Sequence, residues 1–285
     1  MLASGIMDED AGSMQRIIDC GAGAIVTKSI GMQPRDGYAN PTVLELEYGL
    51  LNAMGLPNPG IEQYGQEMKK LRSSTTPIIG SIFGANEKEF TLLAEKMEHY
   101  GASAVELNVS CPHAKHYGLE VGCDTTLLQK IVSSVKDHVQ IPVWVKISPN
   151  VTNIVEIVKA AEQGNADAIV AINTVKGLKI DLETRRPILA NKIGGYSGIA
   201  IKPIGIRCVY DIATQVQIPI IGVGGITTGE DAIEYFLAGA SAVQIGSAVY
   251  YRGLDVFTLI CKEIEQWMST HHIKKITELI GAGHQ

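Results

Sequence analysis

A cysteine that follows a buried strand is the residue of this sequence best placed to do chemistry. The run Ala104-Val-Glu-Leu-Asn108 is short and mostly apolar, lies between Gly101 and Pro112, and predicts a buried strand that ends at Asn108. Cys111 follows in the stretch Asn108-Val-Ser-Cys-Pro-His113. A thiol at this end of a strand can be tuned towards thiolate and can remove a proton from carbon. The alternative, which this stretch alone leaves open, is a buried and inert cysteine.

Two lysines end apolar strands. Lys28 follows Ala24-Ile-Val-Thr27, and Lys146 follows Val143-Trp-Val145. A buried lysine is costly unless it meets an anion or an electron-rich ring. One such lysine could extend to solvent, but two at the carboxyl ends of strands indicate an anionic cofactor. Flavin mononucleotide (FMN) fits, because a lysine near N1 and O2 of its ring stabilises the anionic reduced form.

Glycines end the last two predicted strands. Gly222-Val-Gly-Gly-Ile226 leads into Thr227-Thr-Gly-Glu-Asp231, which begins a helix, and Gln244-Ile-Gly-Ser-Ala248 has a similar form. Glycines at these positions let backbone N–H groups approach a phosphate, helped by a helix N-terminus. We therefore expect a phosphate site, with tight turns that bind nothing as the alternative.

Three asparagines are predicted at the same end of the barrel, where the strands have their carboxyl ends. Asn108 and Asn173 lie at strand ends, and Asn52 lies in the stretch Leu51-Asn-Ala-Met-Gly-Leu56. An amide offers both a donor and an acceptor, which suits the alternating N–H and C=O groups of a pyrimidine dione. A single asparagine could be a turn residue or a helix N-cap, but three together favour contact with a ligand.

The composition argues against several classes of partner. The 285 residues carry a formal net charge of −6, which leaves no basic surface for nucleic acid or for a membrane. The five cysteines are widely spaced, and His113, His116, Cys123 and His138 lack the spacing of a metal site, so we expect neither a disulfide framework nor a bound metal. Without an apolar run of membrane-spanning length or a signal peptide, a cytoplasmic location is expected.

Short apolar runs alternate with segments of helical period, which is typical of a parallel α/β sheet. The predicted strands are Leu2–Ser4, Ala24–Lys28, Ile78–Ser81, Ala104–Asn108, Val143–Lys146, Ala168–Ile172, Ile220–Val223 and Ala242–Ile245. Amphipathic helices are expected over 87–100, 125–138, 151–163 and 228–237. Eight βα units favour a (β/α)₈ TIM barrel, formed as one FMN-binding domain over residues 1–285. An open doubly wound sheet is the alternative.

Two segments are too long for ordinary βα loops. Residues 29–62 follow the second predicted strand, and residues 173–205 follow the sixth. Long segments at the carboxyl ends of barrel strands usually cover an active site, so we expect both to do so. The alternative is that they are insertions without a function.

Together these features resemble the dihydroorotate dehydrogenase family. The matching stretches follow the family order over nearly the whole chain. They are Ala3-Ser-Gly5, Thr27-Lys-Ser29, Asn52-Ala-Met-Gly-Leu56, Asn108-Val-Ser-Cys111, Val145-Lys146, Asn173-Thr174, Gly195-Tyr-Ser-Gly198, Ile201-Lys-Pro203, Gly224-Gly225 and Gly246-Ser247. Cysteine at 111, where membrane-associated members carry serine, is similar to the soluble class 1 type.

The resemblance implies FMN-dependent oxidation of (S)-dihydroorotate to orotate in de novo synthesis of UMP. It makes Cys111 the base that removes the C5 proton, while flavin N5 accepts the hydride from C6. The residues implied for FMN are Ser4, Lys28, Ser29, Asn108, Lys146, Ile172, Gly198, Gly224, Gly225, Gly246 and Ser247. Those implied for the substrate are Lys28, Asn52, Ala53, Met54, Gly55, Leu56, Asn108, Asn173 and Thr174.

Two departures from the family pattern leave alternatives open. His113 stands where many relatives have an asparagine, and the Ser-Cys-Pro-His form is also similar to the pyrimidine domain of dihydropyrimidine dehydrogenases. A substrate of the dihydrouracil type is therefore the nearest rival. A flavin-free phosphate-binding isomerase or lyase, and an inactive barrel kept as a subunit, are more distant ones. The opening hairpin of the family is missing before Ala3, which predicts a natural start upstream of Met1.

The electron acceptor is predicted from the region between Asn173 and Pro203. With its Arg185-Arg-Pro187 segment, this region is similar to class 1 members that reduce NAD through a partner carrying FAD and a 2Fe–2S cluster. The Gly222-Val-Gly-Gly225 turn lacks the spacing of a dinucleotide-binding motif, and the cysteines lack ferredoxin-type spacing. We expect a homodimeric core that binds such partner subunits to form a heterotetramer.

Overall fold

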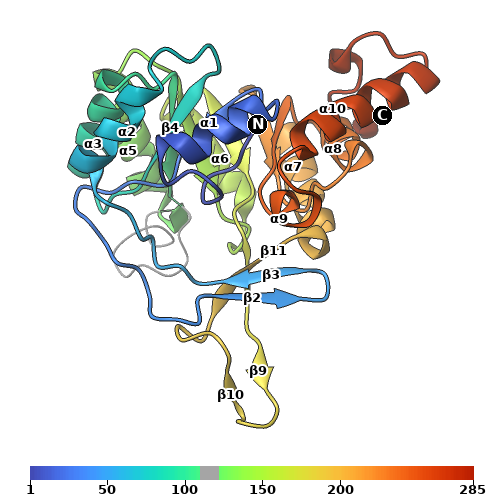
Figure 1. Cartoon of the computed structure of the whole chain (residues 1–285). Helices are drawn as coiled ribbons and strands as arrows, with labels where there is room; N and C mark the ends of the chain where they lie inside the picture. The colour runs from blue at the N-terminus through green and yellow to red at the C-terminus, as the bar shows by residue number, and fades with distance from the viewer. Residues whose placement is uncertain (110–121) are drawn as a thin grey trace.

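A parallel sheet of seven strands, in the order β1-β4-β5-β6-β7-β12-β13, forms the centre of the computed structural model, which describes residues 1–109 and 122–285 (Figure 1). Its strands are β1 (Ile25–Val26), β4 (Ile78–Ile82), β5 (Ala104–Asn108), β6 (Val143–Ile147), β7 (Ala168–Ala171), β12 (Ile220–Val223) and β13 (Ala242–Gln244). Seven of the eight predicted strands are therefore confirmed. Cys111, His113 and His116 lie outside the described residues.

The first predicted strand closes this sheet into a ring. Leu2 forms parallel bridges to Ile25 in β1 and to Ile245, which directly follows β13. The backbone N–H of Leu2 donates to Ala24 O at 2.9 Å, and the N–H of Ala3 donates to Ile245 O at 2.9 Å. Residues 1–3 thus occupy the eighth strand position, although only Leu2 pairs on both sides. The predicted (β/α)₈ barrel is confirmed.

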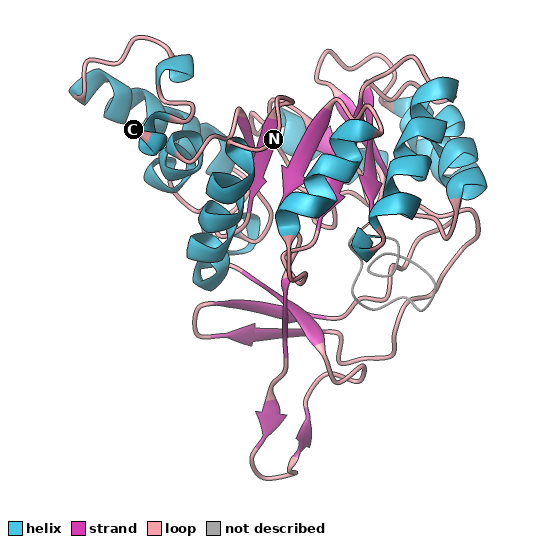
Figure 2. Ribbon diagram, turned by 180° about the vertical axis from the view of Figure 1, so that it is seen from behind, coloured by secondary structure: helices cyan, strands magenta, loops and turns pink. Residues whose placement is uncertain are grey.

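Helices surround the barrel on its outer side (Figures 1 and 2). The α-helices are α1 (Ala11–Asp19), α2 (Ile61–Lys70), α3 (Glu87–His99), α5 (Thr125–His138), α6 (Ile154–Gln163), α7 (Lys202–Ala213), α8 (Gly229–Leu237), α9 (Ala248–Arg252) and α10 (Val256–Thr270). Short 3₁₀ turns are η1 (Ile199–Ile201), η2 (Ile276–Glu278) and η3 (Ala282–His284). No helix in the two described ranges is long and apolar enough to cross a membrane.

The two long segments contain strands that the sequence did not predict. They form a four-stranded sheet in the order β2-β3-β11-β8, here called the cap sheet. Its strands are β2 (Val43–Leu46), β3 (Gly49–Asn52), β11 (Gly194–Ser197) and β8 (Val175–Gly177). A hairpin of β9 (Ile180–Asp181) and β10 (Arg186–Pro187) extends beyond it on the side towards which the barrel strands point (Figure 2). The first segment supplies β2 and β3, and the second supplies β8 and β11, so neither could form this sheet alone.

Prolines and glycines set the ends of the barrel strands. Pro77, Pro142 and Pro219 precede β4, β6 and β12, and their carbonyls accept from Ile25, Val105 and Ile169 at 2.9–3.0 Å. Each proline therefore joins the ladder as an acceptor at a position where its missing N–H costs nothing. Gly101 and Gly239 follow α3 and α8 with φ of +98° and +116°, conformations that favour glycine after a helix.

Alternation along the strands separates two apolar layers. In β5 the side chains of Val105 and Leu107 pack with the outer helices, while Ala104 packs inside the barrel near Val26 and Ile79. The same period-two pattern sends Glu106 and Asn108 inwards. Inside the barrel, small apolar side chains fill the end near the amino termini of the strands, and the polar side chains lie towards the carboxyl ends.

Leu2→Ala is expected to lower the free energy of unfolding by about 2–5 kcal/mol, because Leu2 is fully buried at the position that closes the ring. Leu182→Ala, at a side chain that is 83% exposed, is the matched control and should change stability by less than about 0.5 kcal/mol. Urea unfolding at equilibrium measures both. Equal midpoints for the two variants would show that the Leu2 side chain contributes little to closure.

Candidate active site

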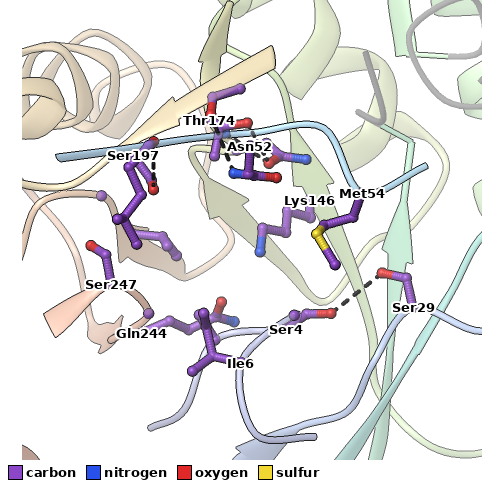
Figure 3. A pocket seen from close by; sticks show the side chains of 18 of the residues that line it. Ser4, Ile6, Ser29, Asn52, Met54, Lys146, Thr174, Ser197, Gln244 and Ser247 are labelled. Atoms are coloured by element: carbon purple, nitrogen blue, oxygen red, sulfur yellow. Dashed lines mark hydrogen bonds between the residues drawn. The ribbon is translucent and has the colours of Figure 1, made fainter. Parts of the chain in front are cut away.

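A cavity of about 380 Å³ lies at the carboxyl ends of the barrel strands and reaches the cap sheet (Figure 3). Its volume falls in the range of sites for small ligands and cofactors. The predicted residues that line it are Ser4, Lys28, Ser29, Asn52, Met54, Gly55, Leu56, Asn108, Lys146, Ile172, Asn173, Thr174, Gly198, Gly224, Gly225, Gly246 and Ser247. Ala53 does not line it, but is buried with Leu51 and Leu189 under the cap sheet. Cys111 lies outside the described ranges.

Hydroxyl and amide groups connect the first strands of the barrel on one wall of the cavity. Ser29 Oγ lies 2.8 Å from Ser81 Oγ and 3.3 Å from Ser4 Oγ, and it accepts from Asn108 Nδ2 at 2.9 Å. Figure 3 shows the link between Ser4 and Ser29. Ser4 and Ser29 follow Leu2 and β1, and Ser81 and Asn108 lie in β4 and β5, so these groups meet because the four strand positions are neighbours in the sheet. They form a wall of donors and acceptors suited to a polar ring.

The opposite end of the cavity is formed by glycine backbone. Gly224 and Gly225 have φ of +129° and +68°, and no backbone carbonyl of the described residues accepts from the N–H groups of Gly225, Gly246 or Ser247. The turn is held from below by Tyr235, whose hydroxyl donates to Gly224 O at 2.7 Å. Backbone N–H groups that no backbone carbonyl pairs, on a supported turn, are typical of phosphate sites.

A partly buried ion pair supports the same end of the cavity. Lys202 Nζ lies 2.7 Å from Asp231 Oδ1, and Asp231 also caps α8 by accepting from the N–H groups of Thr227 and Thr228 at 2.8 Å. Burial alone would raise the pKa of Asp231, but the hydrogen bonds from Lys202 and Thr227 hold that pKa below its usual value. The carboxylate stays charged, which keeps the loop after β12 in place.

The two predicted lysines both reach the cavity but differ in their partners. Lys28 Nζ lies 2.9 Å from Glu9 Oε1, a carboxylate on a side chain that is 70% exposed. Lys146 is 6% exposed, and its Nζ lies 3.8 Å from Glu106 Oε1 inside the barrel. Figure 3 shows Lys146 projecting into the cavity. Lys28 is therefore the lysine nearer to solvent, and Lys146 is the one fixed in the interior.

The loop after Leu2 contains a carboxylate that titrates near neutral pH. Asp8 is 1% exposed and accepts from the N–H of Gly5, which lines the cavity. Burial raises the pKa of Asp8 to about 6, against the opposing effects of the Gly5 hydrogen bond and the charge of Lys28. The segment that carries Ser4 and Gly5 is thus tied to a group that changes its charge close to physiological pH.

Two further predicted polar residues, Asn52 and Thr174, lie in or next to the cap sheet. Asn52 pairs with Gly195 across β3 and β11, and Asn52 Nδ2 donates to Gly195 O at 3.2 Å. Thr174 follows β7, and its carbonyl accepts from Asn150 Nδ2 at 2.9 Å. Asn52 and Thr174 come from the two long segments and meet only because those segments pair. A ligand in the cavity would therefore contact both the barrel and its cap.

The polar residues that line or support the cavity but were not assigned from sequence include Glu106, Gln244 and Ser197. Glu106 is fully buried, Gln244 is 1% exposed and lines the cavity, and Ser197 lines it from β11. The signal for Glu106 was present, since a carboxylate inside the apolar run Ala104–Asn108 is as costly to bury as the two lysines. Ser197 lies in the family stretch Gly195-Tyr-Ser-Gly198 but was not assigned to the site, and its strand was not expected.

The family model described as "Dihydroorotate dehydrogenase" matches residues 1–268. The chain belongs to the dihydroorotate dehydrogenase family. This membership confirms the resemblance found in the motifs, and it implies the flavin cofactor indicated by the lysines and glycines.

Several curated relatives are similar to this family member over almost its full length. A protein of Methanocaldococcus jannaschii is 51% identical over 100% of this chain and 94% of its own length, and one of Pyrococcus furiosus is 52% identical over 99% and 93%. A protein of Thermoplasma volcanium is 51% identical over 99% and 93%. All three are named dihydroorotate dehydrogenase B (NAD(+)), catalytic subunit.

The cavity fits FMN in its chemistry. A phosphate matches the free N–H groups after β12 and β13, and Gly246 leaves room there, because a Cβ on it would meet only Ala3 Cβ at 3.7 Å. The isoalloxazine ring carries both donors and acceptors, which match the serine and asparagine wall, and its reduced form is an anion that Lys146 can stabilise. Each half of the cofactor therefore finds complementary groups at one end of the same cavity.

Gly225→Asp is expected to abolish retention of FMN, since a Cβ at Gly225 would lie 2.8 Å from Gly198 O and the new carboxylate would repel the phosphate. Gly253→Asp is the matched control, because Gly253 has a similar φ of +73° but open space around its Cβ. Flavin absorbance per chain, with circular dichroism to verify folding, measures the outcome. Stoichiometric FMN in folded Gly225→Asp would place the phosphate elsewhere.

Proposed function

We propose that this chain oxidises (S)-dihydroorotate to orotate in de novo pyrimidine synthesis, as one FMN-binding barrel domain over residues 1–285. The observation that carries the proposal is the cavity in which the family motifs meet. It is supported by the match over residues 1–268 and by relatives that are about half identical over more than nine tenths of their own length. Bound FMN supplies the hydride acceptor at its N5 atom. The residues of the chain must bind both molecules, orient them and remove a proton.

The cofactor site is assigned to the residues expected from the family. Gly224, Gly225, Gly246 and Ser247 hold the phosphate with backbone N–H groups, and Lys146 stabilises negative charge on the ring. The remaining assigned residues are Ser4, Lys28, Ser29, Asn108, Ile172 and Gly198, which all line the same cavity. Their positions support the assignment because the phosphate groups and the ring groups lie at opposite ends.

The substrate site is assigned to the side of the cavity that faces the cap. Asn52, Asn108 and Asn173 can each donate to a ring carbonyl and accept from a ring N–H of dihydroorotate. Lys28 is a cation for the substrate carboxylate. Thr174 and the stretch Met54–Leu56 complete the contacts, and Ala53 supports that stretch from its buried position.

Cys111 is assigned as the base that removes the C5 proton. Proton and hydride leave neighbouring carbons, so the base and the flavin must stand on opposite faces of the substrate ring. The assignment rests on the motif Asn108-Val-Ser-Cys111, whose first residue lines the cavity. Bleaching of the flavin by dihydroorotate, but not by dihydrouracil, is the expected result that separates this reaction from the dihydropyrimidine dehydrogenase type.

Cys111→Ala is expected to fold and bind FMN but to slow flavin reduction by dihydroorotate about 10²- to 10⁴-fold, the usual effect of a positioned base. Cys111→Ser should retain a little activity at high pH, because a hydroxyl ionises less readily than a thiol. Cys123→Ala, at an exposed cysteine, is the control and should reduce at the normal rate. Stopped-flow absorbance measures the rates, and normal reduction in Cys111→Ala would assign the base to another residue, with His113 the first candidate.

The electrons are proposed to leave through a second protein. The relatives are named as catalytic subunits of an NAD(+)-linked enzyme, which supports a separate electron-transfer subunit. We assign to that subunit the FAD and the 2Fe–2S cluster, and we propose a cytoplasmic heterotetramer built on a homodimer of this chain. This division agrees with a sequence that has no dinucleotide-binding motif or ferredoxin-type cysteines.

The isolated chain is therefore expected to pass electrons from dihydroorotate to artificial dyes but not to NAD, and to gain NAD reduction when the iron–sulfur flavoprotein subunit is added. Stopped-flow mixing of the reduced chain with NAD, fumarate and quinone measures reoxidation. Rapid reoxidation by fumarate or by NAD alone would contradict the two-subunit assignment without affecting the assignment of the substrate.

A further inference from the structure

Glu106 is a fully buried carboxylate beneath the floor of the cavity. It belongs to β5, where its neighbours Val105 and Leu107 point outwards and Asn108, two residues further on, lines the cavity. In the register of β5 and β6, Asn108 pairs with Lys146 and Glu106 pairs with Trp144. Glu106 therefore lies one inward-facing position deeper than Lys146, with the ammonium above it at 3.8 Å from its Oε1.

A hydrogen bond across the barrel holds this carboxylate in place. Gln244 Nε2, on β13, donates to Glu106 Oε2 at 2.8 Å, although the two residues are 138 positions apart. Within the described part of the chain, neither Glu106 Oε1 nor Gln244 Oε1 has a hydrogen-bond partner. Glu106 is thus fixed on one oxygen, while its other oxygen faces the ammonium of Lys146 with no competing donor.

Burial of Glu106 and Lys146 costs folding free energy that apolar side chains of the same size would not cost. Replacement of a buried ion pair by apolar residues of similar volume is often neutral or stabilising, and the layer below already consists of alanine, valine and isoleucine. The charge of Glu106 acts at short range in an interior that screens it poorly. Its effect on a charge that appears in the cavity is therefore large.

We propose that Glu106 is a positioning residue that holds Lys146 and, through its own negative charge, sets the reduction potential of the flavin. The inference rests on the proposed function, since it requires the flavin ring to lie beside Lys146. Lys146 by itself favours the anionic reduced ring, and Glu106 partly cancels that cation. The substrate can then reduce the flavin, and the reduced flavin can still pass its electrons to the next acceptor.

The second ion pair of the cavity, between Lys28 and Glu9, should affect the potential of the flavin less. Lys28 is paired with Glu9, whose side chain is 70% exposed, so water and salt screen that pair. The pair of Lys146 and Glu106 is much more deeply buried. Its side chains are 8% and 0% exposed, and among the described residues no other ion pair of the cavity has both side chains below one tenth. The potential of the flavin should therefore respond to Glu106 far more than to Glu9.

The direct test is the two-electron midpoint potential of bound FMN in Glu106→Gln, measured by dye-equilibration titration. Loss of the negative charge should favour the reduced form by tenfold or more, which is about 30 mV in the positive direction for two electrons. Gln244→Met removes the hydrogen bond but keeps the carboxylate, and Glu9→Gln removes an exposed carboxylate; each should shift the equilibrium by less than threefold. If FMN is bound to Glu106→Gln and its equilibrium between the oxidised and reduced forms lies within threefold of the wild-type value, the inference is overturned.

A second comparison decides the matter if Glu106→Gln alone does not fold. Lys146→Gln leaves the carboxylate without its cation and should shift the potential in the negative direction at saturating FMN. The double variant Glu106→Gln/Lys146→Gln has neither charge, and its equilibrium should favour reduced FMN at least tenfold more than that of Lys146→Gln. Equal potentials in these two variants would reduce Glu106 to a structural residue.

The wild-type protein separates this inference from the proposed function. A wild-type chain that binds no FMN, or whose FMN is not reduced by dihydroorotate, would contradict both. Normal FMN content and normal reduction in the wild type, combined with an unshifted potential in the Glu106 variants, would contradict only the role of Glu106.

Discussion

The pairing of Leu2 with both ends of the parallel sheet is the constraint on which the rest of this structure depends. An open sheet would leave the carboxyl ends of β1 and β13 far apart, whereas the bridges to Ile25 and Ile245 bring them to one rim. The serine and asparagine wall after the first strands then faces the glycine turns after the last strands. A single cavity with a polar side and an anion-binding end follows from that closure.

Closure also creates an interior where polar groups are expensive. The floor of the barrel is made of small apolar side chains, and above it lie Glu106, Lys146 and Gln244, all nearly or fully buried. Each can stay there because it has a partner on another strand. The same low dielectric that makes these groups costly gives them a strong influence on any charge that forms in the cavity.

The cap sheet gives the cavity its second wall. Two segments separated by more than a hundred residues pair through Asn52 and Gly195, and so place asparagine and threonine side chains opposite the barrel rim. A cavity enclosed in this way can hold a flat cofactor against the barrel and a smaller polar ring above it. This arrangement agrees with a reaction in which a base and a flavin act on opposite faces of the substrate.

The sequence by itself determined the barrel class and most strand positions, because those properties depend on local patterns of burial, glycine and proline. With the family resemblance it also gave more than half of the residues that line the cavity. It also predicted Cys111, on which the described residues carry no information. The cap sheet was not predictable, since β3 pairs with β11 from a distant segment and the local pattern of these segments looks like a loop. Only the tertiary structure joined Glu106 to Gln244 and Lys146, because a contact across the barrel depends on ring closure and leaves no periodic signal in the chain.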